Sequence, residues 1–254
     1  MSGPAVGAIG TFRAAVTLLT RLPVGVPADA ATSGAAAFPL VGALVGLGMA
    51  VVLVLVGGGE PVLAALGAVG IGVLLTGALH LDGLADTADA LAAPTPERAD
   101  AARTDPSSGP AGVAAIVLAI GLEAAALASL VADAPLRAGA ALVACSAVAR
   151  AVPVVTGLLA APAEASGSGF GSWFIRGIRP RDATIATGLT VVVVGMAAVV
   201  SEPLVAVAAT LAAVVGLAAW VWLRRRRGGL DGDGLGALIV VTGVAGLAAM
   251  ACLT

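Results

Sequence analysis

The chain has 254 residues, of which 59% are hydrophobic and only 11% are charged, and its formal net charge is −2. A soluble domain keeps much of its surface polar, so this composition excludes one and predicts a polytopic membrane protein. The nearly neutral charge, with no basic segment interleaved with aromatic residues, argues against a nucleic-acid partner.

The N-terminal segment, residues 5–20, is only moderately apolar and is interrupted by Arg13. It lacks the pattern of a cleavable signal peptide, so we expect an amphipathic segment that lies in the interface or re-enters the membrane. Seven later stretches approach the roughly 20 residues that cross a bilayer. They are 36–57, 62–80, 111–132, 136–160, 183–201, 203–223 and 234–253. The expected fold is an all-α, polytopic bundle of about seven transmembrane helices, forming a single domain over residues 1–254.

The arginines predict the orientation of this bundle. Nearly all of them lie in the N-terminal segment and in the long connections 81–110, 161–182 and 224–233. With seven spans, these connections share one side, which the positive-inside rule makes cytoplasmic. The C-terminus is then external. Arg137 is the exception in an opposite-side turn, and Arg150 lies within a span.

Three carboxylates follow the second predicted span. Asp82, Asp86 and Asp89 are spaced i, i+4 and i+7, so a helix would place them on one face. Like charges at this distance repel, and a divalent cation such as Mg2+, which prefers oxygen ligands, would relieve that repulsion. Asp105 precedes the third span and could join them in a helical hairpin. A solvated acidic loop would explain the charges, but not their spacing or the flanking Gly83 and Gly109.

Later segments hold further candidate residues. Glu123 and Arg150 lie at similar depths in the third and fourth spans, where ionisable residues are costly, so we expect them to pair. The glycine-rich loop 167–176 ends at Arg176 and could close over phosphates, although an interfacial aromatic belt explains it equally well. Asp231 and Asp233 lie in a glycine-rich turn, where backbone N–H groups can approach a substrate.

Five segments together resemble the cobalamin synthase family, the cobalamin-5'-phosphate synthases or adenosylcobinamide-GDP ribazoletransferases. They are RLPV at 21–24, FPLVG at 38–42, TGALHLDGLADTAD at 76–89, DPSSGPAG at 105–112 and GGLDGDGLGA at 228–237. Their order is that of the family, and they span nearly the whole chain. Two departures stand out: Pro106 and Ser107 replace a usual Ser-Arg, and Asp231 replaces a usual Thr.

The resemblance implies the last step of nucleotide-loop assembly in cobalamin. An alcohol of α-ribazole, or of its 5'-phosphate, attacks the phosphoryl group attached to adenosylcobinamide in adenosylcobinamide-GDP, and GMP leaves. Family members use Mg2+ and are bound to the lipid bilayer, so the expected location is the bacterial cytoplasmic (inner) membrane, with the active site facing the cytoplasm.

Roles for individual residues follow from this chemistry. We expect Asp82, Asp86, Asp89 and Asp105 to hold the metal, with Asp82, Asp89 and His80 as catalytic residues. Asp89 or His80, the only histidine, would accept the proton of the attacking hydroxyl. The expected substrate-binding residues are Arg150, Arg176, Asp233, Gly83 and Gly109.

Two other functions fit parts of the sequence. A CDP-alcohol phosphotransferase also uses spaced aspartates, but Asp86 stands where its motif has an Arg. A cation transporter would need acidic residues through the bilayer, and Glu123 is the only one within a predicted span. The sequence leaves the oligomeric state open, a homo-oligomer included.

Overall fold

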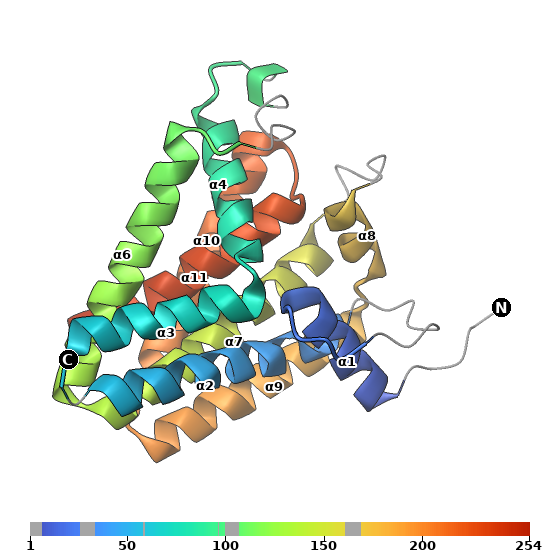
Figure 1. Cartoon of the computed structure of the whole chain (residues 1–254). Helices are drawn as coiled ribbons and strands as arrows, with labels where there is room; N and C mark the ends of the chain where they lie inside the picture. Colours follow the sequence, from blue (N-terminus) through green and yellow to red (C-terminus); the bar gives the residue numbers. More distant parts are fainter. Residues whose placement is uncertain (1–6, 26–33, 58, 96, 100–106, 161–168) are drawn as a thin grey trace.

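A computed structural model describes residues 7–254 apart from 26–33, 58, 96, 100–106 and 161–168. All the regular secondary structure of these residues is helical, and no strand occurs among them (Figure 1). The helices are α1 (Ala8–Leu19), the short 3-10 helix η1 (Ala35–Ala37), α2 (Phe38–Gly57), α3 (Pro61–Thr76), α4 (Leu79–Ala92), α6 (Pro110–Asp133), α7 (Pro135–Leu159), α8 (Phe170–Gly177), α9 (Pro180–Val200), α10 (Leu204–Arg227) and α11 (Gly232–Leu253).

Six of the seven predicted spans are single helices long and apolar enough to cross a membrane: α2, α6, α7, α9, α10 and α11. Their ends lie within four residues of the predicted ones. Pro110, Pro135 and Pro180 each stand in the first turn of a helix, where the missing N–H costs no hydrogen bond. The chain is therefore a multi-pass membrane protein.

The second predicted span is broken. α3 ends at Thr76, and α4 leaves it at an angle of 91°. Gly77 and Ala78, at φ 62° and 59°, both adopt the left-handed conformation, and the chain bends at these two residues. The Arg21 side chain lies against Gly77, and the Arg21 N–H donates to the Leu75 carbonyl (2.8 Å). The connection predicted from residue 81 therefore begins as a helix, which continues to Ala92 and carries Asp82, Asp86 and Asp89 as their spacing predicted.

α3 and α4 are long and apolar enough for one crossing only when they are counted together as a bent pair. α3 alone has 16 residues, about 24 Å at 1.5 Å per residue, which is short of the roughly 30 Å hydrocarbon core. In Figure 1, α6 starts near the end of α4 and returns to the end of the bundle where α3 began. Counted with this bent pair, the described helices give up to seven crossings, and seven is the number that agrees with the alternation of the arginines.

The turn between α6 and α7 holds Arg137, the arginine that departs from the positive-inside pattern. This turn lies at the lower left of Figure 1 with the α2–α3 turn, the α9–α10 turn and the C-terminus. Arg137 there pairs with Glu202 of the α9–α10 turn (Nε–Oε1 2.8 Å). The positive charge is thus compensated on the side predicted to be external.

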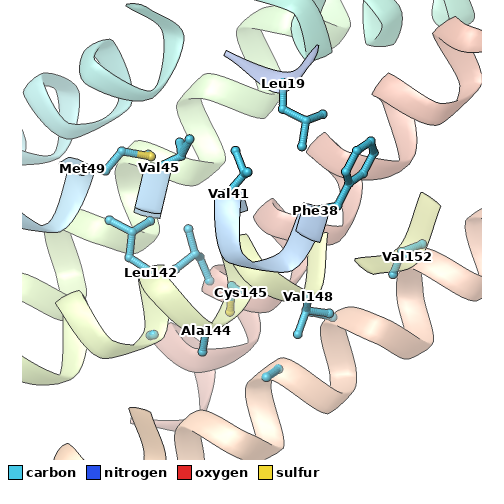
Figure 2. Packing of buried hydrophobic residues seen from close by; sticks show 14 of the residues in the cluster. Leu19, Phe38, Val41, Val45, Met49, Leu142, Ala144, Cys145, Val148 and Val152 are labelled. Atoms are coloured by element: carbon cyan, nitrogen blue, oxygen red, sulfur yellow. The ribbon is translucent and has the colours of Figure 1, made fainter. Parts of the chain in front are cut away.

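α7 is the central helix of the core. Figure 2 shows Leu142, Cys145 and Val148 of α7 beside Val41 and Val45 of α2. The two backbones approach closely because α2 carries glycines at the contact; a Cβ on Gly46 would lie 2.8 Å from the Leu142 carbonyl oxygen. Gly42 and Gly46, four residues apart on α2, both face α7. Small residues spaced in this way commonly allow helices to pack closely in membranes.

Candidate active site

Two segments about 150 residues apart in the sequence meet where α4 crosses α11. Gly83 lies against the backbone of Asp233 and Gly236, and a Cβ on Gly83 would stand 2.8 Å from the Asp233 carbonyl oxygen and 3.2 Å from Cα of Gly236. Asp82 and Asp86 flank Gly83 on α4. The crossing therefore brings the predicted acidic helix beside Asp233.

Asp89 fastens α4 to the start of α6. Its Oδ2 accepts from the Gly109 N–H (2.7 Å) and its Oδ1 from the Gly112 N–H (2.9 Å). These amides are among those that a helix leaves unpaired at its N-terminus, and a carboxylate there also interacts favourably with the helix dipole. A Cβ on Gly112 would overlap the Asp89 carboxylate. Gly109 thus contacts Asp89, and this contact gives both residues a positioning role.

The departure at Asp231 has a structural explanation. Asp231 is the N-cap of α11, accepting from the Gly234 N–H (2.8 Å), and it pairs with Arg227 (Nη2–Oδ2 2.6 Å). Both side chains are largely buried. The added negative charge is therefore compensated by Arg227.

A cavity of about 250 Å3 adjoins the α4–α11 crossing. Its polar lining is Asp82, His80 and Asp233. Most of its remaining wall is apolar and includes Phe38 and Phe174, whose rings stack with centroids 5.2 Å apart. Asp82, predicted to be catalytic, and Asp233, predicted to bind substrate, thus lie at one edge of a mainly apolar cavity, which Asp89 does not line.

A second, smaller cavity of about 80 Å3 lies deeper in the bundle. It is lined by Glu123, Arg150, Ser146 and His80 among mainly apolar residues. Glu123 and Arg150 face this common space, but among the residues described they form no ion pair within 4 Å; Arg150 instead donates weakly to the Ser146 carbonyl (3.5 Å). The predicted direct pairing is therefore wrong in this structure.

His80 borders both cavities. It is buried, and its Nε2 has no hydrogen-bond partner within the described part of the chain. Arg150 lines only the inner cavity, so the structure does not bring it to the wall that Asp82 and Asp233 share.

Two other predicted site residues lie elsewhere. Arg176 is exposed on α8, a helix where the sequence suggested a flexible loop. This helix approaches α11 closely, because a Cβ on Gly171 would overlap the Gly232 nitrogen. Asp105, the fourth predicted metal ligand, is outside the described residues.

The carboxylates fit Mg2+ only in part. Asp82 and Asp86 lie one helical turn apart, and Asp233 adjoins them across Gly83. Within the described ranges, however, no three acidic, histidine or cysteine side chains are close enough to enclose an ion. Mg2+ usually keeps several waters and binds one or two carboxylates together with substrate phosphates, and this donor set suits that mode.

The apolar half of the site was not predicted from the sequence. Leu19, Phe38, Pro153 and Phe174 come from α1, α2, α7 and α8, and nothing in their local sequence connects them. The FPLVG segment and the aromatic pair of residues 173 and 174 were the available signals. The structure separates this pair, since Trp173 is 45% exposed whereas Phe174 is 2% exposed.

Comparison with known proteins points to one family. The sequence model described as Cobalamin-5-phosphate synthase matches residues 11–251. A protein named adenosylcobinamide-GDP ribazoletransferase from Allorhizobium ampelinum is 37% identical over 222 residues, which cover 85% of this chain and 84% of that protein. Proteins of the same name from Rhizobium etli (34% identical, 96% of both chains) and a Nocardioides species (37% identical, 94% of this chain and 97% of the relative) also match. No solved structure matches the chain.

Proposed function

The chain belongs to the cobalamin-5-phosphate synthase family of enzymes, and from this membership we propose that it joins adenosylcobinamide-GDP to α-ribazole or its 5'-phosphate. In this reaction a hydroxyl oxygen of the acceptor bonds to the phosphorus attached to cobinamide. The bond from that phosphorus to the bridging oxygen breaks, and GMP leaves with this oxygen. The hydroxyl proton passes to a base, and the product is a phosphodiester.

The observation that carries this proposal is the crossing of α4 and α11 at Gly83. It brings together the two most distinctive segments of the family resemblance, residues 76–89 and 228–237, at the edge of a cavity. Phosphoryl transfer demands mainly positioning and charge stabilisation, and acidic residues at a closely packed helix crossing are held in fixed positions. Neither a CDP-alcohol phosphotransferase nor a transporter is favoured by any comparable feature.

We assign Mg2+ binding to Asp82, Asp86 and Asp233, whereas Asp89 directs both oxygens at α6. A bound Mg2+ would neutralise charge on the diphosphate and on the departing phosphate. Asp105 remains a further proposed ligand. Asp82 and His80 both border the cavity and are the two candidates for accepting the hydroxyl proton.

The reaction would take place on the cytoplasmic side of the bacterial inner membrane. α4 ends, and α11 begins, at the end of the bundle that carries the arginine-rich segments. The positive-inside rule assigns this end to the cytoplasm. Nucleotide substrates and Mg2+ are available there.

Turnover by purified protein tests the proposal. We would measure GMP release from adenosylcobinamide-GDP with α-ribazole or its 5'-phosphate and Mg2+, with and without EDTA. Asp82→Ala should lower kcat by about 100-fold or more, because charge stabilisation by a metal site contributes several kcal/mol and each 1.36 kcal/mol is tenfold. Asp133→Ala, an exposed carboxylate at the opposite end of α6, is the matched control and should remain active.

The outcomes separate the components of the proposal. Loss of GMP release with EDTA and in Asp82→Ala, but not in Asp133→Ala, would support both the reaction and the metal site. Full activity in EDTA would refute the Mg2+ assignment alone. Folded protein that releases no GMP would refute the reaction.

A further inference from the structure

The cavity beside the α4–α11 crossing has two chemically different sides. Asp82, Asp233 and His80 supply its polar groups, whereas Leu19, Phe38 and Phe174 belong to its apolar wall. Figure 2 shows the Leu19 side chain directed toward the Phe38 ring. A ligand that fills this cavity therefore needs an apolar part and a part that approaches carboxylates.

On the basis of the proposed function, we infer that this cavity binds the acceptor nucleoside, with its aromatic base against Phe38 and Phe174 and its ribose toward Asp82 and Asp233. The apolar wall then determines which bases the enzyme accepts. The expected ligand is a riboside of an apolar two-ring heterocycle, such as α-ribazole, whose base is dimethylbenzimidazole.

Size excludes the corrinoid from this position. The cavity holds about 250 Å3, slightly below the roughly 300–1,000 Å3 of pockets for drug-sized ligands. A two-ring base fits such a space, but a corrin macrocycle with its amide side chains does not. The corrinoid and its diphosphate must approach from outside the cavity, where the exposed Asp82 stands.

Polarity excludes guanine, the other base in the reaction. Guanine carries donors and acceptors around its edge, and each would lose its water partners against an apolar wall, which is unfavourable. The carbocyclic edge of a dimethylbenzimidazole presents only C–H and methyl groups. An aromatic base is also stabilised by stacked or edge-to-face contacts, which Phe38 and Phe174 can offer.

The inferred orientation has a consequence for the chemistry. With the base inserted first, the ribose faces Asp82 and Asp233, the acidic side chains that the described residues contribute to the cavity wall. The attacking hydroxyl is then held near a proton acceptor and near the proposed Mg2+ ligands. Four helices, α1, α2, α7 and α8, contribute only apolar residues to this wall and thus position the acceptor without supplying a carboxylate.

The test is equilibrium binding of α-ribazole to the purified full chain, followed by the fluorescence of its base, without adenosylcobinamide-GDP. Phe174→Ala should raise the Kd about tenfold or more. Trp173→Ala, an exposed residue on the same helix, is the control and should leave the Kd unchanged.

A second variant tests the base site even if Phe174→Ala fails to fold. Leu235→Phe narrows the cavity from α11 and should change the order of preference, so that the riboside of unmethylated benzimidazole is used better than α-ribazole in kcat/KM. This altered preference is a readout that simple loss of stability does not produce.

The inference and the proposed function fail in different ways. Normal turnover with unchanged Kd in Phe174→Ala and unchanged base preference in Leu235→Phe would refute the base site and leave the reaction intact. Displacement of α-ribazole by GMP, in a manner that depends on Phe174, would also refute it, because the cavity would then hold the leaving group. Absence of turnover despite Phe174-dependent binding of α-ribazole would support the base site and refute the proposed reaction.

Discussion

Replacing Asp89 distinguishes a positioning carboxylate from a metal ligand. Asp89 accepts hydrogen bonds from Gly109 and Gly112 at 2.7 and 2.9 Å. A hydrogen bond to a charged group contributes about 1.5–3 kcal/mol, so the two together contribute about 3–6 kcal/mol. When the carboxylate is removed, water can reach the half-buried Gly109 amide but not the buried Gly112 amide. Because water replaces one of the two hydrogen bonds, we expect a loss at the lower end of the 3–6 kcal/mol range. We therefore expect Asp89→Ala to destabilise the protein by about 3 kcal/mol.

The assay combines denaturation in detergent with hydrogen exchange. Asp89→Ala should unfold at lower denaturant concentration, and peptides that contain the start of α6 should exchange faster. Asp89→Asn should lose about half as much, because its one carbonyl oxygen can accept from only one of the two amides. Gly112→Ala should reproduce the destabilisation, since its Cβ would overlap the Asp89 carboxylate. Gly121→Ala, on the same helix with open space around the new Cβ, is the control.

One result would refute this reasoning. If Asp89→Ala keeps the parent's unfolding curve and exchange pattern while losing activity as Asp82→Ala does, Asp89 acts as a metal ligand or base, and its bonds to α6 contribute nothing measurable.

Further predictions concern the helix crossing and the topology. Gly83→Ala should destabilise the protein by about 1–3 kcal/mol and reduce turnover, because the new Cβ forces α4 and α11 apart. The control is Gly70→Ala, whose new Cβ meets no atom within 4 Å and which should be neutral. Equal effects of the two substitutions would contradict the close crossing of α4 and α11. In intact cells, a membrane-impermeant maleimide should label the exposed Cys252 from outside and leave the buried Cys145 unlabelled. A cysteine introduced by Thr95→Cys, just after α4, should be labelled only in inverted vesicles. Labelling of this cysteine in intact cells would show that the proposed orientation is wrong.

Hydrophobic segments and arginine distribution predicted most of the fold. Each unbroken span is a run of apolar residues ended by Gly, Pro or charge, and such runs need only local sequence to be recognised. The break after Thr76 was missed because Gly77 and Ala78 lie inside an apolar run. Their left-handed conformation accompanies the docking of Arg21, more than 50 residues earlier in the chain.

The spacing of Asp82, Asp86 and Asp89 predicted a shared helix, and the structure confirms that helix. The spacing did not predict that Asp89 accepts hydrogen bonds from the start of α6 while Asp82 borders a cavity. Helical spacing fixes which side chains share a face, but their partners depend on which other helices pack there.

The sequence by itself determined the membrane class, the six unbroken spans and the acidic segment, because each is encoded in neighbouring residues. Only the tertiary structure decided that Gly83 meets Gly236, that Asp231 is compensated by Arg227, and that Phe38 and Phe174 stack beside the carboxylates. These contacts join residues from helices distant in the chain. They depend on the close approach of whole backbones, which small residues permit but whose partners no local pattern specifies.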